Sequence, residues 1–129
     1  MSTKKIIFTD KAPAPIGPYN QAVLVNETTL YTSGQIALHP QTMELVLDDI
    51  ETETKQVMEN MKAVLEAANM TFDNVVKTTI FIMDMNDFTR INTVYGSYFD
   101  EKIAPARETV QVACLPKNVN VEISMIAVK

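Results

Sequence analysis

The side chains best suited to chemistry lie late in the chain, one arginine and one glutamate among apolar neighbours. Arg107 begins one segment, 107–114, and Glu122 lies in another, 119–128, in which polar and apolar residues alternate. Side chains that alternate in this way point to the two opposite faces of a β-strand. An arginine and a glutamate in such strands are candidates for a partly buried polar site. A structural ion pair, or charges at a sheet edge, would produce the same pattern.

Four other residues are of types that can take part in chemistry. Asn92 falls within the apolar stripe of a segment with helical periodicity, although an asparagine there can instead satisfy nearby backbone groups. Tyr19 lies in a proline-rich loop, where a tyrosine usually packs its ring and hydrogen-bonds its hydroxyl. His39 precedes a proline and is expected to be an exposed loop residue. Cys114 is expected to be a small core residue and not a nucleophile.

The composition predicts one globular domain spanning residues 1–129. Hydrophobic residues make up 47% and charged residues 21% of the chain, which excludes wholesale disorder. The formal net charge of −5 argues against generic binding to nucleic acid or to an anionic membrane. One cysteine excludes an intramolecular disulfide, and one histidine excludes a zinc site built from histidines. No apolar run forms a signal peptide or approaches the ~20 residues of a membrane helix, so we expect a cytoplasmic protein.

Two amphipathic helices are predicted from apolar residues that recur at three- and four-residue spacing. The first runs from residue 48 to 68, with acidic residues in its first turns and Asn69 as a left-handed terminator. The second extends to residue 99, with Asn86 or Asp87 as its cap.

Six strands are predicted from segments that are β-branched, aromatic or alternating. Their residues are 4–9, 21–25, 29–35, 75–83, 109–114 and 119–128. The resulting order, β-β-β-α-β-α-β-β, describes a two-layer α+β sandwich with both helices on one face of the sheet. The other sheet face must be buried by something else, and oligomerisation is the simplest answer.

Several short motifs occur in order along almost the whole chain, without large insertions between them. They are IGPYNQA at 16–22, TSGQI at 32–36, VVKTT at 75–79, MNDF at 85–88, PAR at 105–107 and VEI at 121–123. In these motifs and their order the chain resembles the RidA (YjgF) family of reactive-intermediate deaminases. The resemblance implies a chorismate-mutase-like fold with a mixed six-stranded sheet. It also implies a homotrimer with a central β-barrel core and active sites in clefts between subunits.

The activity implied by the resemblance is the hydrolysis of 2-imino and 2-enamino acids to 2-oxo acids and ammonia. Such intermediates, 2-iminobutanoate and 2-iminopropanoate among them, are released by PLP-dependent dehydratases. The deaminase itself is expected to need no metal and no cofactor. The family's carboxylate-binding arginine matches Arg107, and its water-positioning glutamate matches Glu122. Further substrate-binding positions are expected at Tyr19, Ser33, Gly34 and Asn92.

Thr109 departs from the family pattern, because some members carry a cysteine at this position. The threonine removes any thiolate mechanism and leaves Thr109 as a candidate substrate-binding residue. Glu108 also stands where a small residue is common, although alternation along the strand points it to the other face. The chemistry is therefore expected to rest on Arg107 and Glu122.

Two other functions fit the same residues. A ligand-binding or regulatory module could hold a 2-oxo acid at Arg107 without turnover, since a fold does not determine a function. Glu122 favours an enzyme, because a carboxylate sensor has no need of a second anionic group beside its ligand. An RNA-directed inhibitor of translation is opposed by the net charge of −5 and by the absence of a cluster of Lys and Arg.

Overall fold

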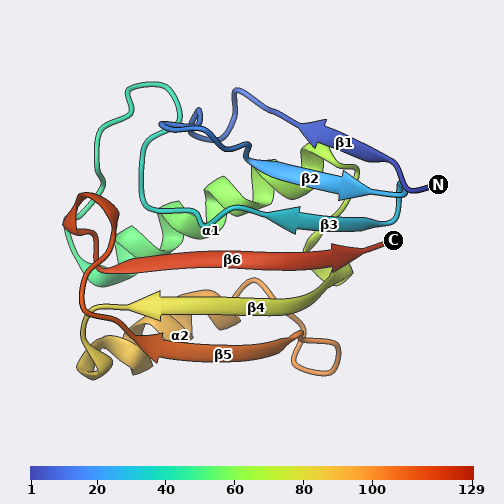
Figure 1. Cartoon of the computed structure of the whole chain (residues 1–129). Helices are drawn as coiled ribbons and strands as arrows, with labels where there is room; N and C mark the ends of the chain where they lie inside the picture. The colour runs from blue at the N-terminus through green and yellow to red at the C-terminus, as the bar shows by residue number, and fades with distance from the viewer.

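A six-stranded sheet runs through the molecule and carries both α-helices on one of its faces (Figure 1). The computed structural model describes all residues 1–129. The strands are β1 Lys4–Ile7, β2 Ala22–Val25, β3 Thr29–Thr32, β4 Val75–Ile82, β5 Ala106–Gln111 and β6 Val121–Val128, and the helices are α1 Ile50–Ala67 and α2 Phe88–Gly96. The strand order is β1-β2-β3-β6-β4-β5, in which only β4 and β5 run parallel. The predicted α+β architecture with a mixed sheet is confirmed.

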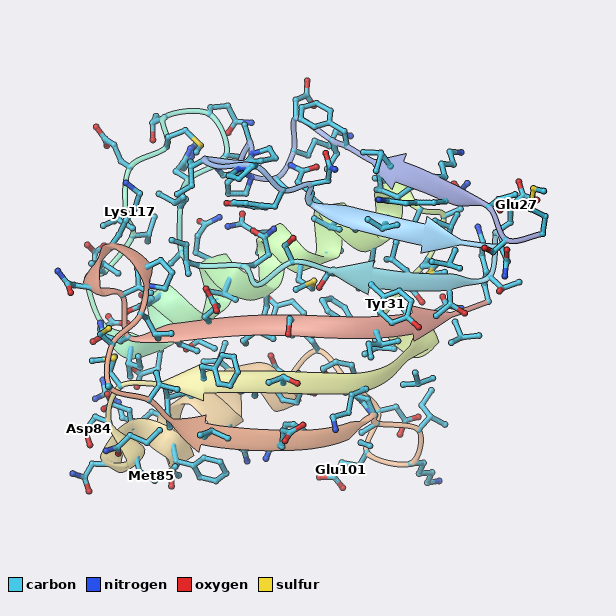
Figure 2. The ribbon with its side chains drawn as sticks, in the orientation of Figure 1. Glu27, Tyr31, Asp84, Met85, Glu101 and Lys117 are labelled. Carbon is cyan, nitrogen blue, oxygen red and sulfur yellow. The ribbon has the colours of Figure 1, made fainter.

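The core lies between the sheet and the helices, and alternation along β6 decides which residues enter it. Val121, Ile123 and Met125 are buried, whereas Glu122 between them is only half-buried on the opposite face. Burial of apolar side chains of this size is the main source of stability in such a layer. The face turned away from the helices is left open, and Tyr31 stands on it with 50% of its surface exposed (Figure 2).

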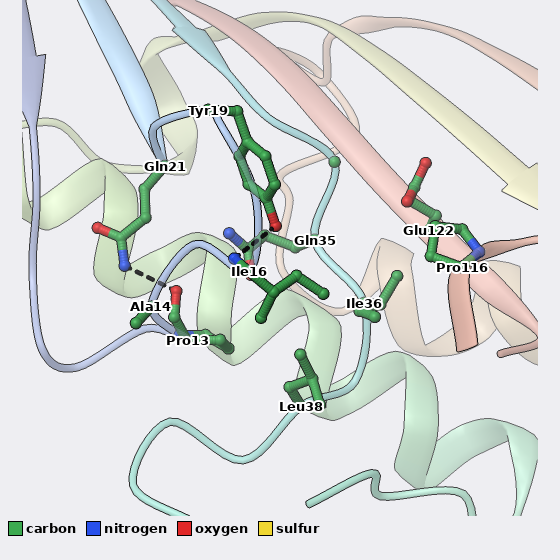
Figure 3. A pocket seen from close by; sticks show the side chains of 11 residues that line it. Pro13, Ala14, Ile16, Tyr19, Gln21, Gln35, Ile36, Leu38, Pro116 and Glu122 are labelled. Atoms are coloured by element: carbon green, nitrogen blue, oxygen red, sulfur yellow. Dashed lines mark hydrogen bonds between the residues drawn. The ribbon is translucent and has the colours of Figure 1, made fainter. Parts of the chain in front are cut away.

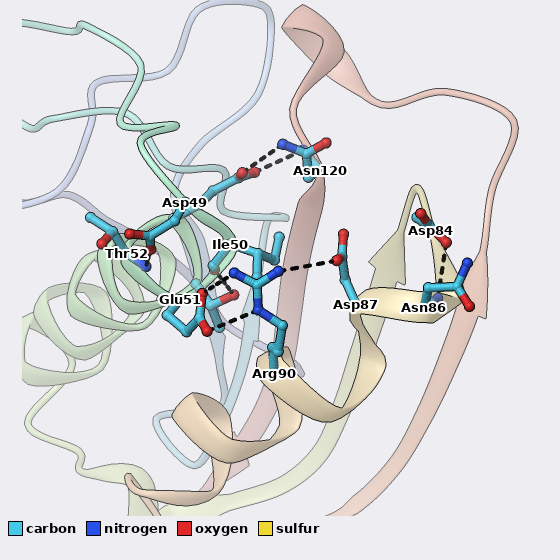
Figure 4. A network of polar contacts seen from close by, with 11 residues as sticks. Asp49, Ile50, Glu51, Thr52, Asp84, Asn86, Asp87, Arg90 and Asn120 are labelled. Atoms are coloured by element: carbon cyan, nitrogen blue, oxygen red, sulfur yellow. Dashed lines mark hydrogen bonds and ion pairs between the residues drawn. The ribbon is translucent and has the colours of Figure 1, made fainter.

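Helix α1 is confirmed, although it begins two residues later and ends one residue earlier than the predicted 48–68. The Asp49 carboxylate caps it by accepting a hydrogen bond of 2.7 Å from the backbone N–H of Thr52 (Figure 4). Asn69 follows the helix in the left-handed conformation, with φ 58°. Neither α1 nor α2 is long and apolar enough to cross a membrane.

Helix α2 is approached by a short 3₁₀ turn, which changes the expected capping. Asp87 precedes the helix but makes no side-chain cap hydrogen bond. The cap belongs instead to Asp84, whose carboxylate accepts a hydrogen bond of 2.9 Å from Asn86 N–H at the start of the 3₁₀ turn (Figure 4). The guanidinium of Arg90 then binds Glu51 through two hydrogen bonds of 2.6 and 2.9 Å, which ties α2 to α1.

Several predicted strand ends were wrong, since the first strand ends at Ile7 and not at residue 9, and β5 covers Ala106–Gln111 and not 109–114. The third strand ends at Thr32 and not at residue 35, because an extra residue interrupts its pairing with β6. Cys114 is exposed and is not a core residue. Strand β5 ends at Gln111, so Cys114 lies in the connection that follows, where strand alternation no longer assigns faces.

A buried carboxylate on α1 fixes the start of β6, and no pattern in the sequence predicted it. Glu53 of α1 is fully buried. Its carboxylate accepts hydrogen bonds from the backbone N–H of Asn120 at 2.7 Å, from the Asn120 side-chain amide at 2.8 Å and from Val121 N–H at 3.2 Å. The contacts of Asn120 are visible in Figure 4. Glu53 therefore joins the first turn of α1 to the point where β6 begins, directly before Glu122.

Replacing Glu53 with alanine should lower the free energy of unfolding by about 3 kcal/mol, because three donors would be left without an acceptor in a buried place. Glu66→Ala, at an exposed position of the same helix, is the matched control and should change stability by less than about 0.5 kcal/mol. Chemical denaturation followed by circular dichroism measures both. Similar values for the two variants would contradict the role assigned to Glu53.

Candidate functional site

A cleft of about 60 Å³ opens beside Glu122, between the proline-rich loop and the start of β6 (Figure 3). Three of the residues predicted from the sequence line it, namely Tyr19, Gly34 and Glu122. The other lining residues are Pro13, Ala14, Ile16, Gln21, Gln35, Ile36, Leu38 and Pro116. The cleft is thus largely apolar and contains one carboxylate.

The Glu122 carboxylate makes no hydrogen bond and no ion pair within the chain. Burial raises its pKa above the ordinary glutamate value, because desolvation disfavours the charged form. A carboxylate with a raised pKa and free lone pairs is suited to take a proton from a water molecule and to return it later.

Tyr19 and Gly34 line the cleft in different ways. The Tyr19 hydroxyl accepts a hydrogen bond of 3.3 Å from Ile16 N–H, so its own proton is free to donate (Figure 3). Gly34 lies directly against Glu122. Ser33, by contrast, uses its hydroxyl to donate a hydrogen bond of 2.5 Å to the Asn20 carbonyl and does not line the cleft.

Gln21 is a residue of this site that the sequence analysis missed. It is buried, and its side-chain amide donates to the carbonyls of Thr9 and Pro13, both at 2.9 Å, while its side-chain oxygen accepts from Thr9 N–H at 2.8 Å. These bonds hold the proline-rich loop that carries Tyr19. A glutamine at the end of a loop has no periodicity that would have distinguished it from a solvated side chain.

Arg107 forms a second cluster, on strand β5. Its guanidinium carbon lies 5.1 Å from the ring centre of Tyr95 and 5.6 Å from that of Phe88, and its Nη1 donates a hydrogen bond of 2.6 Å to the Asn92 side-chain oxygen. Stacking on aromatic rings fixes the plane of the guanidinium. Arg107 is exposed and has no carboxylate partner. Its remaining N–H donors can therefore bind an anion in a bidentate manner.

Tyr95 remains a neutral hydroxyl beneath this guanidinium. Burial raises the pKa of Tyr95, and this effect outweighs the opposing contributions of its hydrogen bond to Thr78 and of the Arg107 charge.

Thr109 lies on the same face of β5 as Arg107, since their partners on β4 are Ile80 and Thr78. Its hydroxyl oxygen is buried and has no hydrogen-bond partner, which is the only such case among the side chains of the molecule. Glu108 between them points to the opposite face, as predicted, and pairs there with Lys77 at 2.9 Å.

The two clusters stand on opposite faces of the sheet. Arg107 pairs with Thr78 on the helix-covered face, whereas Glu122 pairs with Phe81 on the open face. From strand spacing and rise, their Cα atoms are about 14 Å apart. One chain thus brings Tyr19, Gly34 and Glu122 together, and separately Asn92, Arg107 and Thr109. A small ligand cannot contact Arg107 and Glu122 of the same chain at once.

Comparison with known proteins places this geometry in a family. The family described as "Endoribonuclease L-PSP" matches residues 9–129. A RutC family protein of Synechocystis is 56% identical, over 98% of this chain and 97% of its own. The chain belongs to the RidA (YjgF/RutC) family. Among RidA family members, the 2-iminobutanoate/2-iminopropanoate deaminase of Mus musculus is 48% identical over 98% of this chain and 92% of its own.

Solved structures of RidA family members share the fold throughout. A crystal structure from Thermotoga maritima superposes with a TM-score of 0.94 at 50% identity and covers 98% of both chains. Escherichia coli TdcF with bound serine gives a TM-score of 0.90 at 46% identity, over 97% of this chain and 98% of its own. The resemblance seen in the sequence motifs is confirmed.

Replacing either of two threonines on the helix-covered face with valine should change the free energy of unfolding, but in opposite directions. Thr109→Val removes a buried hydroxyl that has no partner and should raise the free energy of unfolding by about 1 kcal/mol. Thr78→Val removes the acceptor of a 3.0 Å hydrogen bond from the buried Tyr95 hydroxyl and should lower it by about 1–2 kcal/mol. Thermal and denaturant unfolding of both variants checks this, and a loss of stability in Thr109→Val would show that its hydroxyl is satisfied.

Proposed function

We propose that this RidA family protein hydrolyses 2-imino and 2-enamino acids, such as 2-iminobutanoate and 2-iminopropanoate, to 2-oxo acids and ammonia. The observation that carries the proposal is the presence, at positions matching the family's motifs, of two charged groups of opposite sign that have no ionic partner, the Arg107 guanidinium and the Glu122 carboxylate. The deaminase name of the mouse relative supports it. The substrates would be produced by PLP-dependent enzymes in the cytoplasm.

Arg107 would bind the carboxylate that all these substrates share. A planar guanidinium donates two parallel hydrogen bonds to a carboxylate, which fixes the position of the adjacent C2 carbon. The rings of Phe88 and Tyr95 and the Asn92 side chain already hold the guanidinium in one orientation. Little order would then have to be imposed when the substrate binds.

Glu122 would activate the water. The carboxylate takes a proton from a water molecule while the oxygen of that water attacks C2 of the protonated imine. The electron pair of the C=N π bond moves to nitrogen. The proton then passes to the nitrogen of the resulting carbinolamine. The C–N bond breaks, ammonia leaves, and the hydroxyl proton is lost as the C=O bond forms. The sum is one imine and one water giving one 2-oxo acid and one ammonia, without a covalent intermediate.

Both roles can be combined only if neighbouring chains share a site, because Arg107 and Glu122 lie on opposite faces of one sheet. The open sheet face, with Tyr31 and Val110 exposed, offers the apolar surface for such an assembly. We propose a homotrimer in which these faces form a central barrel and each active site lies between two subunits. With a net charge of −5, neither nucleic acid nor membrane is proposed as a partner.

Mixing two inactive variants tests this arrangement. Arg107→Ala and Glu122→Gln should each lower kcat/KM by about 30- to 1000-fold, equivalent to about 2–4 kcal/mol. In trimers assembled from equal amounts of both, about one interface in four joins an intact Arg107 to an intact Glu122, so about one quarter of the wild-type activity should return. The assay is ammonia release from an imine generated in situ by a PLP-dependent dehydratase. No recovery on co-expression would show that both residues act within one chain or not at all.

The pH dependence of the reaction follows from the ionisation of Glu122. Only the ionised carboxylate accepts a proton, and its pKa lies above the ordinary value of 4.5. The rate constant kcat/KM should therefore decline as the pH falls through a midpoint above 4.5. In Glu122→Gln the residual activity should show no such midpoint. An unchanged acid limb in this variant would assign the limb to another group.

Binding without turnover is the second candidate, and the serine held by the related TdcF structure favours it. A function of this kind would require only the cluster of Asn92, Arg107 and Thr109, and not Glu122. If a 2-oxo acid binds the wild-type protein and Arg107→Ala abolishes the binding, while no imine is hydrolysed faster than in buffer, the protein is a carboxylate sensor. Both quantities can be measured on one preparation, by calorimetry and by ammonia release.

A further inference from the structure

The pairing between β3 and β6 contains one extra residue on the β3 side. Tyr31 pairs with Ile126, but further along Gln35 pairs with Ile123, through hydrogen bonds of 2.8 and 3.1 Å. Four residues on one side therefore oppose three on the other, which defines a β-bulge within residues 32–34. Bulges re-aim the side chains that follow them.

The bulge decides which face Gly34 occupies. Leu30 faces the core, so strict alternation would also place residue 34 on the core side. After the bulge, Gln35 faces the core instead and is buried beside Ile123. Gly34 is thus turned to the open face, the face on which Glu122 stands.

At this position only a glycine leaves room for the carboxylate. A Cβ atom on Gly34 would lie 2.7 Å from the Glu122 carboxyl carbon, 2.9 Å from its Cγ and 2.9 Å from its Oε1. The three nearest atoms all belong to the Glu122 side chain, and the Gly34 backbone is not in a left-handed conformation that would itself require glycine. The clash is with the end of one flexible side chain, so the fold can survive a larger residue while the carboxylate cannot keep its place.

We infer that Gly34 is a positioning residue for Glu122. The bulge turns Gly34 toward the open face, and the absence of a Cβ atom there leaves the space that the Glu122 carboxylate occupies; we call this space the seat of the carboxylate. The expected effect of Gly34 on kcat rests on the proposed hydrolysis. The expected effect of Gly34 on the position of the Glu122 side chain does not depend on any activity. It differs from a role of the Gly34 N–H in binding substrate, because here Gly34 acts through the glutamate.

Three hydrogen bonds, made by two residues, stabilise the bulge. The Thr32 hydroxyl accepts a hydrogen bond of 2.9 Å from Met125 N–H, in place of a regular ladder bond. Ser33 donates from its backbone N–H to the Gln21 carbonyl at 2.9 Å and from its hydroxyl to Asn20. Ser33 therefore supports the position of Gly34, which gives it a role even though it does not line the cleft.

A double-mutant cycle tests the inference. Gly34→Ala should lower kcat by about 10- to 100-fold with little change in KM, because the water-activating group is displaced by a fraction of an ångström or more. In a Glu122→Gln background the same change should alter kcat by less than about twofold, since the group it displaces no longer acts. Equal losses in both backgrounds would overturn the inference and assign Gly34 a role of its own. Gly96→Ala is the matched control, because a Cβ there meets nothing within 4 Å.

A second measurement decides the matter even if the protein hydrolyses no imine. The carbon-13 shift of the Glu122 carboxyl reports its pKa directly. Displacement from the seat exposes the carboxylate, so in Gly34→Ala the pKa should fall toward the ordinary glutamate value. An unchanged titration would overturn the inference. If Gly34→Ala alone does not fold, shortening the clashing side chain in Gly34→Ala/Glu122→Ala must restore folding, and failure to do so would overturn it as well.

Discussion

The register of β6 is the constraint on which the rest of the molecule depends. This strand lies inside the sheet between β3 and β4, and its alternate residues fill the core under α1. A shift by one residue would bury Glu122 and expose Ile123. The fully buried carboxylate of Glu53 prevents such a shift, because it binds the two backbone N–H groups at the start of the strand. Glu53 on α1 thereby determines the face of the sheet on which Glu122 lies.

Unsatisfied groups are concentrated where chemistry is proposed. Some charged residues elsewhere form ion pairs, as Arg90 does with Glu51 and Lys77 with Glu108. Arg107 and Glu122 have no ionic partner, and Thr109 next to Arg107 buries a hydroxyl without a hydrogen bond. A chain selected for stability alone would have paired or replaced these groups. The buried Thr109 hydroxyl and the desolvated Glu122 carboxylate are therefore the groups whose cost to stability we attribute to the proposed site.

Local patterns predicted the architecture well and the site only in part. Alternation assigned Val121 and Ile123 to the core. The preference of asparagine for the left-handed conformation placed Asn69 at a helix end. Alternation orders residues within one strand, however, and does not relate the faces of two strands, so it could not show that Arg107 and Glu122 stand on opposite sides. The bulge and the exposed Cys114 were missed for a related reason. An extra residue in β3, and the end of β5 at Gln111, each interrupt the alternation of faces from which the prediction was made. The bonds of Glu53 and Gln21 span long stretches of sequence and have no local signature.

The placement of the two charged clusters on opposite faces has a consequence for inheritance. In a ring of copies sharing their sites, a chain lacking Arg107 can still lend its Glu122 to a neighbour. Activity in a mixed population would then decline in simple proportion to the share of defective chains. A chain defective in both clusters would spoil two sites, and activity would decline with the square of the intact share. In the proposed trimer, a variant that breaks the register of β6 would belong to this second class, since a misplaced β6 displaces the Glu122 carboxylate and disturbs the sheet that carries Arg107.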